Sequence, residues 1–454
     1  MGALEVTRFA LDPSCRVVDG GRVLLGGSPL TLFRLGPGGI DVVDAIRSGR
    51  APAAGHERLT DRLVESGAAH PQPRPGSGPA RTEVTLVIPA YGAPPARLAA
   101  LVRCTGAGAA VVVDDASTRP IDAVAGATVV RLERNHGPGA ARQAGVALAT
   151  TPYVAFLDTD TLPSSAWLDA LLPHFTDERV GLVAPRIRST PGRGLLARYE
   201  RWRSPLDLGP APARVRSGTR ISYVPAAAVV VRIAALTAVG GFDATLRFGE
   251  DVDLVWRLDA AGWRVRYEPA STVLHDPRPS FGEWARQRFN YGSSAAPLAD
   301  RHPGALAPAR MNRWSAAAWG VGVVAPPAGV AIAAATTAML ARKLATLQHP
   351  WRIAGRLAGL GHLFAGRILA AALVRAWFPF AVIAALMSRR ARLITGVAVV
   401  APPLVAWIRD RPEIDPVRAI GLHIADDLAY GAGLWRGMAR ARSLAAIRPV
   451  LTTG

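Results

Sequence analysis

Two carboxylates stand two residues apart at the end of an apolar run in the first half of the chain. The run covers residues 153–157, and Asp158 and Asp160 follow it. A hydrophobic strand that stops at such a pair presents acid at the edge of a sheet. Divalent cations such as Mg²⁺ and Mn²⁺ prefer oxygen ligands and are often shared between carboxylates and substrate phosphates. The pair therefore predicts a cation held against a diphosphate; the alternative is an ordinary strand-to-turn junction, where Asp is common.

Polar residues also follow other predicted strands. The apolar runs, separated by helical stretches, cover residues 84–88, 110–113, 128–132 and 153–157. Runs that are apolar on both faces indicate a parallel sheet covered by helices, so the predicted fold class is α/β. Ligands of such sheets bind at the carboxyl ends of the strands. Here those ends carry Pro89, Tyr91, Asp114 and Asp115 as well as the 158–160 pair.

Residues 1–70 form a small separate module in this interpretation. Asp19-Gly20-Gly21 lies between two short apolar runs, which is a hairpin signal. The expected elements are strands at 16–18, 23–25 and 30–33 and helices around 40–46 and 59–64. This pattern predicts a winged-helix-like module. The proline-dense segment 71–81 predicts a linker, because proline at that density continues neither a helix nor a central strand. Residues 82–300 are assigned to the α/β domain.

Residues 301–454 are assigned to an apolar, arginine-flanked helical region. The apolar stretches are 315–341, then 369–387 and 393–408. Pro326 and Pro327 within the first stretch would kink or break a helix there. Flanking arginines suit anionic lipid headgroups, so we expect membrane association at the cytoplasmic face. The charge of Arg375, within the second stretch, would cost free energy at the centre of a bilayer. This favours interfacial or re-entrant helices over helices that span the membrane. The alternative is an alanine-rich helical core in a cytoplasmic protein.

The charge and cysteine content of the chain limit the classes of partner that it is expected to bind. The 454 residues include 53 Lys and Arg against 34 Asp and Glu, a net charge of +19. Such a balance can indicate nucleic acid or an anionic membrane. No basic patch interleaved with aromatic residues is present, so nucleic acid is not expected. Cys15 and Cys104 lie far apart, which predicts no metal cluster or disulfide framework and fits a reducing cytosol. No long apolar segment near the start indicates a secretory signal.

The order of five motifs is more specific than any one of them. In sequence they are Ile88-Pro89-Ala90-Tyr91, Val113-Asp114-Asp115-Ala116-Ser117, Asn135-His136-Gly137-Pro138-Gly139-Ala140-Ala141-Arg142, Asp158-Thr159-Asp160 and Phe248-Gly249-Glu250-Asp251. This series, over roughly residues 82–292, resembles the family 2 glycosyltransferases of the GT-A fold. The resemblance implies a Rossmann-like domain that binds a nucleotide-sugar, with Pro89 and Tyr91 at the donor site.

Donor-site roles follow from the residues and from the resemblance together. A carboxylate at Asp114 or Asp115 can accept from the imide N–H of uracil or close an Asx turn; the resemblance favours Asp115, with Asp114 second. Arg142 lies one turn into a helix and can offer a fork of donors to the nucleotide or to Asp158, or it is a plain surface arginine. The resemblance implies that Asp158 faces the ribose or base and that Asp160 ligates Mg²⁺ or Mn²⁺.

Glu250 and Asp251 are assigned to catalysis. An inverting transfer needs one carboxylate to take the proton from the attacking acceptor hydroxyl, and we assign that role to Asp251. The pair stands just before a helical pattern, so the alternative is a helix-capping acid. The helix N-terminus is expected to lower the pKa of Asp251 and keep it ionised.

Four later residues are weaker candidates. His275 follows the last predicted strand, and a late histidine sometimes completes the metal site in enzymes of this fold; a lone histidine is more often structural. Trp284 is placed against the acceptor, and Arg286 or Arg288 against the diphosphate. This segment departs from the Gln-x-x-Arg-Trp motif of processive polysaccharide synthases, which argues against long-chain processive synthesis.

One subgroup fits the whole chain. The N-terminal module, the transferase domain and the apolar tail together resemble the glycosyltransferases of the actinobacterial mycofactocin system. The resemblance implies transfer of glucose, extended through β-1,4 links, from a nucleotide-linked donor to a peptide-derived redox cofactor or its precursor. The module also looks like winged-helix modules that hold peptides; the alternative is a packing or oligomerisation domain.

Two other functions compete with this one. A cell-envelope glycosyltransferase acting on a lipid or polysaccharide would suit the apolar tail equally well. A degraded fold could serve as a membrane scaffold or peptide-binding module without activity. The acids kept together at three predicted strand ends argue against the degraded fold, since an inactive site has no reason to retain them.

Overall fold

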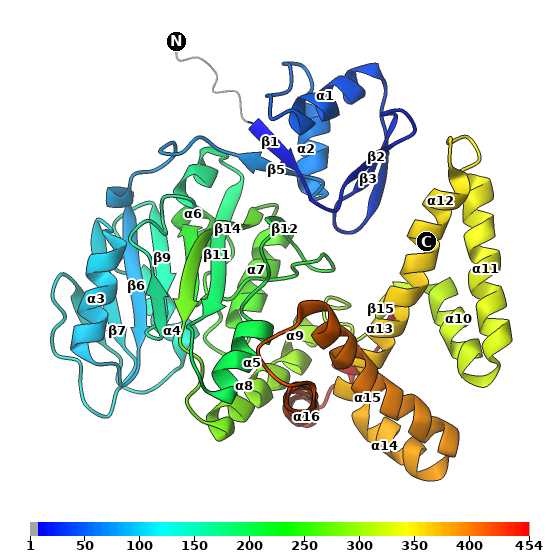
Figure 1. Ribbon diagram of the computed structural model, residues 1–454. Coiled ribbons are helices and arrows are strands. Elements are labelled where there is room, and N and C mark those ends of the chain that lie inside the picture. Colours follow the sequence, from blue (N-terminus) through cyan, green and yellow to red (C-terminus); the bar gives the residue numbers. More distant parts are fainter. Residues whose placement is uncertain (1–7, 454) are drawn as a thin grey trace. The chain divides into compact units, whose positions relative to one another are not determined.

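The computed structural model describes residues 8–453 and divides into two compact units (Figure 1). The first unit contains residues up to Arg193 together with Arg203–Pro277. The second contains Gly194–Trp202 and Arg278–Gly454.

The first unit begins with a module of short strands and two helices, residues 8–72, called the N-terminal module below. Its elements are β1 (Arg8–Leu11), β2 (Arg16–Val18), β3 (Val23–Gly26), β4 (Thr31–Arg34), α1 (Pro37–Arg47), α2 (Glu57–Glu65) and β5 (Ala69–Gln72). The expected hairpin and third strand are confirmed as the antiparallel sheet β2-β3-β4. A second sheet pairs β1 with β5. Leu24, Phe33 and Leu63 are buried between these sheets and the helices.

A nine-stranded sheet forms the rest of the first unit. Its strands are β6 (Val84–Ala90), β7 (Ala109–Asp114), β8 (Thr128–Arg131), β9 (Tyr153–Leu157), β10 (Thr161–Pro163), β11 (Val180–Ser189), β12 (Ala213–Val215), β13 (Ala228–Arg232) and β14 (Arg264–His275). The order is β10-β14-β11-β13-β9-β6-β7-β8, with β12 beside β14. The accompanying helices are α3 (Pro95–Thr105), α4 (Pro138–Val146), α6 (Ile233–Ala238) and α7 (Glu250–Ala260), with 3₁₀ turns at Arg81–Glu83 and Leu172–Thr176.

The predicted α/β class and the four predicted strands are confirmed, but the sheet is mixed. Strands β6 to β9 are parallel to their neighbours within that group, whereas β13 runs antiparallel to both β9 and β11. Four of the five residues of β13 are buried, as are most residues of the parallel strands β6, β7 and β9. A strand covered on both faces has the same apolar pattern in either direction, so the pattern could not show the reversal.

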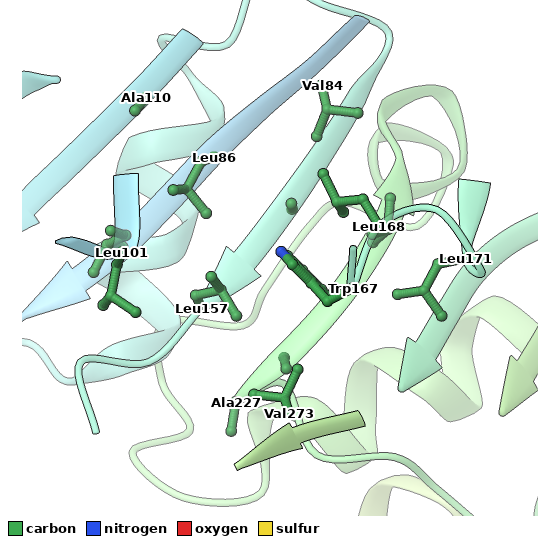
Figure 2. Packing of buried hydrophobic residues seen from close by; sticks show 14 of the residues in the cluster. Val84, Leu86, Leu101, Ala110, Leu157, Trp167, Leu168, Leu171, Ala227 and Val273 are labelled. Atoms are coloured by element: carbon green, nitrogen blue, oxygen red, sulfur yellow. The ribbon is translucent and has the colours of Figure 1, made fainter. Parts of the chain in front are cut away.

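A continuous hydrophobic core lies against this sheet (Figure 2). Trp167 is fully buried among residues from strands and loops, including Leu86, Leu157 and Val273. Burying a large apolar side chain contributes about 1.5–3 kcal/mol. The core thereby fixes β6, β7 and β9 side by side, and their carboxyl ends open onto the same edge of the sheet.

The second unit is helical. Its elements are α5 (Leu195–Arg203), α8 (Phe281–Ser293), α9 (Ala295–Arg301), β15 (Arg310–Asn312), α10 (Arg313–Val324), α11 (Pro326–Lys343), α12 (Pro350–Ala354), a π-helical turn (Gly355–Gly359), α13 (Leu360–Arg375), α14 (Phe378–Met387), α15 (Arg389–Asp410), α16 (Pro416–Ala441), a 3₁₀ turn (Ala445–Ile447) and β16 (Val450–Thr452). Helix α8 packs closely on α16: a Cβ added at Gly433 would lie 1.9 Å from the backbone oxygen of Phe289.

The apolar stretches of this unit are interrupted helices. Residues 315–341 are divided at Ala325, so the predicted break at Pro326 and Pro327 is confirmed. Residues 369–387 are divided between α13 and α14. Within the described residues 8–453, two helical stretches are long and apolar enough to cross a membrane, Pro350–Arg375 and Arg389–Asp410.

Candidate active site

The turn after β9 holds Asp158 and Asp160 at the sheet edge. The backbone N–H of Asp158 donates to Ala227 on the neighbouring chain segment, at 2.9 Å. Thr161 donates to the carbonyl of Asp158 through its backbone N–H and through its hydroxyl, at 3.1 and 2.7 Å. These bonds fix the turn independently of the two carboxyl groups, which remain available for chemistry.

Arg97, on α3, supports the same turn from the other side. Its Nε donates to the carbonyl of Thr159 at 2.5 Å, and Nη2 donates to Oδ2 of Asp276 at 2.7 Å. The N–H of Asp276 in turn donates to the carbonyl of Asp160 at 2.9 Å. Sequence reasoning missed Arg97 and Asp276, because no local signal separates them from the many other charged residues of the chain.

Arg142 lies between two carboxylates. Its Nη2 donates to Oδ1 of Asp158 at 2.6 Å, and Nη1 donates to Oε1 of Glu250 at 2.8 Å. The side chain is 2% exposed and lies over the ring of Phe242. Burial disfavours its charge, but the two carboxylates outweigh burial and raise the pKa of Arg142. Of the two partners expected for Arg142, the nucleotide and Asp158, the structure shows Asp158, and Glu250 is an additional partner.

Glu250 and Asp251 occupy the first turn of α7, whereas the sequence predicted them just before the helix. Oδ1 of Asp251 accepts from the N–H of Val252 at 2.8 Å, and Oδ2 accepts from the N–H of Ala226 at 3.3 Å. The expected lowering of the pKa of Asp251 is wrong: burial outweighs Arg142 and these N–H donors, and raises its pKa. Burial, reinforced by the charge of Asp251, also raises the pKa of Glu250 to about 7.

Asp160 and His275 lie beside each other. Strands β10 and β14 pair Thr161 with His275, which brings His275 Nε2 to 3.3 Å from Asp160 Oδ1. The pKa of Asp158 is raised by burial and by the charge of Asp160, while Arg142 and His275 oppose the rise. The charges of Asp160 and His275 therefore act on the proton affinity of Asp158.

The carboxylate oxygens of Asp158 and Asp160 suit Mn²⁺ or Mg²⁺, with further positions left for substrate oxygens. Within residues 8–453, no group of three or more His, Cys, Asp or Glu side chains could hold a metal ion by itself. A cation held by Asp158 and Asp160 would take its remaining ligands from phosphate and water.

Asp114 and Asp115 have different surroundings. The carboxylate of Asp114 is completely buried and accepts from the N–H groups of Ser117 and Ile121 and from Arg131. The second-choice assignment of Asp114 to the nucleotide does not fit this structure, because its oxygens already hold the 114–121 loop together.

Asp115 anchors the loop that leads into α4. Its two carboxylate oxygens accept from the N–H groups of His136 and Gly137, each at 2.8 Å. A carboxylate has about four lone-pair sites, so Asp115 keeps acceptor capacity for a base. Pro89 lies near the end of β6, opposite Val113 of β7. Tyr91 follows the strand and is 60% exposed, so its ring is accessible at the predicted donor edge.

Trp284, Arg286 and Arg288 belong to the second unit. Trp284 is completely buried and donates from Nε1 to Oε1 of Glu200 at 2.8 Å. Arg288, 2% exposed, contacts Glu200 and lies 3.1 Å from Asp426. The predicted contacts of Trp284 with an acceptor and of Arg288 with a diphosphate do not fit, because α5 and α16 already surround both side chains. Arg286 is exposed on α8.

Comparisons with known proteins agree with this geometry. Residues 85–234 match the family model of glycosyl transferase family 2. The chain is 40% identical over 472 aligned residues to the "Pre-mycofactocin glycosyltransferase" of two strains of Mycobacterium tuberculosis, covering 98% of this chain and 97% of theirs. It is 30% identical to a succinoglycan biosynthesis protein of Rhizobium meliloti, over 41% of this chain and 60% of that protein.

Among solved structures, the mannosyltransferase of Pyrobaculum calidifontis in complex with GDP-Man and Mn²⁺ is 19% identical, covers 65% of this chain and 87% of that one, and has a TM-score of 0.35. The near full-length match to the mycobacterial protein is far stronger and extends through both units. The chain therefore belongs to glycosyl transferase family 2, in the group of the pre-mycofactocin glycosyltransferases.

Proposed function

We propose that this glycosyltransferase moves a hexose, with inversion, from a nucleotide-sugar to the peptide-derived redox cofactor mycofactocin or its precursor. One observation carries the catalytic part: Asp158, Arg142 and Glu250 form a buried chain of ion pairs that ends beside Asp251. The acceptor is supported by the name of the relative with 40% identity over 98% of the chain. Glucose as the sugar and β-1,4 linkage in longer products complete the proposal.

The proposed reaction is a single displacement. The acceptor hydroxyl attacks C1 of the sugar from the face opposite the nucleotide, and its proton passes to the carboxylate of Asp251. The new bond joins C1 to the acceptor oxygen, and the bond from C1 to the phosphate oxygen breaks. The nucleoside diphosphate leaves with that electron pair. A raised pKa suits Asp251 for this task, because a general base works best when its pKa is near the working pH.

Donor binding is assigned to the opposite side of the cluster. Asp115 and Tyr91 lie at the strand ends proposed for the nucleotide. Asp160, Asp158 and His275 are the residues that would hold Mg²⁺ or Mn²⁺. When bound there, the cation would supply Lewis-acid stabilisation of charge on the leaving diphosphate. Arg142 keeps Asp158 in place beside this site, through the 2.6 Å contact described above.

Replacement of Asp251 by Asn tests the proposed base. Asp251→Asn keeps the shape of the side chain but cannot accept the proton, so we expect transfer to be abolished and donor affinity to be nearly unchanged. Transfer is measured by mass spectrometry of the acceptor and donor affinity by calorimetry. Glu283→Gln, at an exposed position on α8, is the control and should retain activity. Transfer at a near-normal rate by Asp251→Asn would show that another group is the base.

The competing function is a transferase for a cell-envelope lipid or polysaccharide. The observation that favours it is the set of apolar, largely exposed helices of the second unit. Purified protein is offered a nucleotide-sugar with either the peptide-derived acceptor or an envelope lipid acceptor in bilayers. Glycosylation of the peptide-derived acceptor alone supports our proposal, and glycosylation of the lipid alone supports the competitor. Absence of both turnover and donor binding would support a scaffold instead.

The same helices support a proposed location at the cytoplasmic face of the membrane. Exposed apolar side chains would enter the bilayer, while the arginines at the helix ends would meet anionic headgroups. These arginines are Arg342, Arg352, Arg389, Arg390 and Arg409, whereas Arg367 lies in the middle of α13. Recovery of the protein only in the supernatant after low-salt lysis would contradict this location.

A further inference from the structure

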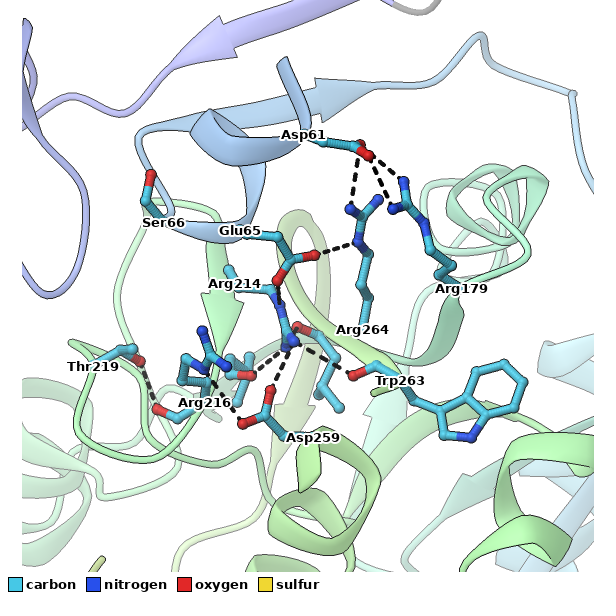
Figure 3. Close-up of polar contacts among 12 residues, drawn as sticks. Asp61, Glu65, Ser66, Arg179, Arg214, Arg216, Thr219, Asp259, Trp263 and Arg264 are labelled. Carbon is cyan, nitrogen blue, oxygen red and sulfur yellow. Dashed lines mark hydrogen bonds and ion pairs between the residues drawn. The ribbon is translucent and has the colours of Figure 1, made fainter. Parts of the chain in front are cut away.

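Helix α2 of the N-terminal module carries two acids that contact three arginines of the sheet domain (Figure 3). Asp61 forms two hydrogen bonds with Arg179, at 2.8 and 3.0 Å. Oε1 of Glu65 accepts from Nε of Arg264 at 2.5 Å, and Oε2 accepts from Nε of Arg214 at 3.3 Å. Since Asp61 and Glu65 are four residues apart, they lie on one face of the helix. That face is docked on the sheet domain.

Arg214 and Arg264 are interior cations of this contact. Their side chains are only 4% and 5% exposed. Buried charges persist when they are paired and hydrogen-bonded, and they resist displacement because each move leaves a charge uncompensated. The contact therefore holds the module in a defined place on the first unit.

Arg214 also reaches the helix that carries the proposed base. Its Nη2 donates to Oδ1 of Asp259 at 2.7 Å, and Figure 3 shows Asp259 on the far side of the guanidinium from Glu65. Asp259 lies in the last turn of α7, whose first turn contains Glu250 and Asp251. One guanidinium thus joins the module to the far end of the catalytic helix.

A second path runs through the loop 216–226. The hydroxyl oxygen of Ser28, in the module, accepts from the backbone N–H of Arg220 at 2.6 Å. Two residues later, the carbonyl of Ser222 accepts from Nε1 of Trp256, on α7, at 2.7 Å. The loop ends at Ala226, whose N–H donates to Oδ2 of Asp251. The module therefore supports both the helix and the loop that orient the carboxylate.

We infer that the N-terminal module is part of the catalytic apparatus: through Arg214 and the 216–226 loop it positions α7, and with it Asp251. Arg214 and Ser28 are positioning residues, since neither contacts the carboxylate itself. The inference rests on the proposed role of Asp251. Because α7 is a continuous helix, a shift at Asp259 is carried to its first turn, and a misplacement of about 1 Å can cost about a hundredfold in rate.

The chain offers a matched pair of variants for the test. Arg214 and Arg264 are equally buried and share Glu65, but only Arg214 contacts α7; the other partners of Arg264 are Asp61 and Asp177. Lysine keeps the charge but, as a point charge on a flexible stem, cannot hold two partners in a fixed fork. Arg214→Lys and Arg264→Lys should therefore weaken the docking contact similarly and differ in their effect on α7.

The full-length variants are compared for kcat, acceptor KM, donor affinity, melting temperature and the pH profile of transfer. For Arg214→Lys we expect kcat to fall about tenfold or more with unchanged donor affinity, and the acid limb of the profile to move, because Asp251 is displaced. For Arg264→Lys we expect a similar loss of melting temperature with kcat and the pH profile retained. Equal kcat in both variants and an unmoved pH profile would overturn the inference, because the contact would then be only structural.

Ser28→Ala tests the second path with a small change at the surface. It removes the acceptor for the N–H of Arg220, and we expect kcat to fall with the melting temperature nearly unchanged; unaltered kcat would remove the loop from the inference. Asp251→Asn in the same assay tests the proposed base separately from the positioning role of the module. An inactive Asp251→Asn with a fully active Arg214→Lys refutes the positioning role alone, whereas an active Asp251→Asn refutes the proposed base.

Discussion

Arg142 is a buried cation with a carboxylate on each side. In such a cluster each charge is tolerated because the others compensate it, and removal of one partner of a buried pair typically costs about 3–5 kcal/mol. Arg142 therefore joins the end of β9, through Asp158, to the start of α7, through Glu250. The planar guanidinium of Arg142 thereby holds both Asp158, on the proposed donor side, and Glu250, which precedes the proposed base.

Arg142→Lys tests whether the link between Asp158 and Glu250 through Arg142 is needed for activity. A lysine ammonium keeps the charge but cannot donate along two fixed directions to Asp158 and Glu250. We expect kcat/KM to fall about tenfold or more, equivalent to about 1.4 kcal/mol of transition-state stabilisation. The measurement is steady-state transfer, with circular dichroism as a check on folding. Arg186→Lys, at a half-buried pair with Asp207 elsewhere in the unit, serves as control. Equal activity in both variants would contradict the role of Arg142.

The raised carboxyl pKa values predict opposite pH trends for activity and stability. The pKa of Glu250 is about 7 and the pKa of Asp251 lies above 3.8. As pH falls through 7, Glu250 takes up a proton and its ion pair with Arg142 weakens; as pH falls further, Asp251 is protonated, it stops accepting and transfer declines. The folded state binds the Glu250 proton more tightly than the unfolded state does, so this group stabilises the fold as pH falls from about 7 towards 4.5.

Glu250→Gln isolates the stability effect, because Gln does not titrate. At each pH we subtract the melting temperature of the wild-type protein from that of the variant. We expect this difference to be larger at pH 8 than at pH 5. The pH–rate profile of the wild-type protein should decline on the acid side near neutrality, with donor affinity measured at each pH as control. Full transfer activity maintained down to pH 5 would contradict the raised pKa values.

At the scale of elements, helices α4 and α7 approach each other at Gly139. A Cβ added there would lie 2.9 Å from Cγ of Glu250, closer than real Cβ contacts. Alanine gains up to about 1 kcal/mol of helix propensity over glycine. Here that gain competes with displacement of a carboxylate that Arg142 holds. Because the displacement would disturb the 2.8 Å contact between Glu250 and Arg142, we expect it to dominate.

Gly139→Ala should therefore lower kcat while leaving the overall fold intact. Gly282→Ala is the matched control, because Gly282 lies in the first turn of α8 and a Cβ there meets nothing within 4 Å. It should be neutral or slightly stabilising. Transfer rates and melting temperatures of both variants make the comparison. An active Gly139→Ala would show that Glu250 has room to move without loss of function.

The elements themselves were well predicted where the pattern is local. Strands β6, β7, β8 and β9 appear where the apolar runs predicted them, and the helix breaks after Val324, before Pro326. The reversal of β13 and the pairing of β10 with β14 were not predicted. Strand direction and partner are set by which surfaces meet across the fold, and a run of valines is equally apolar in either direction.

At the scale of the whole molecule, the second unit exposes large apolar side chains. On α14, Leu386 and Met387 are 77% and 83% exposed. An apolar side chain of this size gains about 1.5–3 kcal/mol when it leaves water. We therefore predict that the double variant Leu386→Glu, Met387→Glu binds anionic vesicles at least about tenfold more weakly than the wild-type protein.

Vesicle co-sedimentation measures this difference. Val417→Glu is the control, because Val417 is 78% exposed in the first turn of α16, outside both α14 and the two long apolar stretches, and its replacement should leave binding unchanged. Equal sedimentation of all three proteins would show that α14 does not enter the bilayer.

The sequence by itself determined the α/β class of the catalytic domain and its membership of a glycosyltransferase family. Acidic motifs in a set order, each directly after an apolar run or before a helix, already indicated a nucleotide-sugar site with Asp158, Asp160 and Asp251 as its main residues. Such features are readable because strand ends and helix starts are encoded within a few residues. The near full-length relative is consistent with that interpretation.

Only the tertiary structure decided how those residues are held. It joined Arg142 to Asp158 and Glu250, raised the pKa of Asp251 against the local helix effect, and enclosed Trp284 within the second unit. It also linked the N-terminal module to α7, because Arg214 pairs with both Glu65 and Asp259. Burial and ion pairing depend on side chains that meet from distant parts of the chain, and no local pattern specifies which of 53 basic residues will meet which acid.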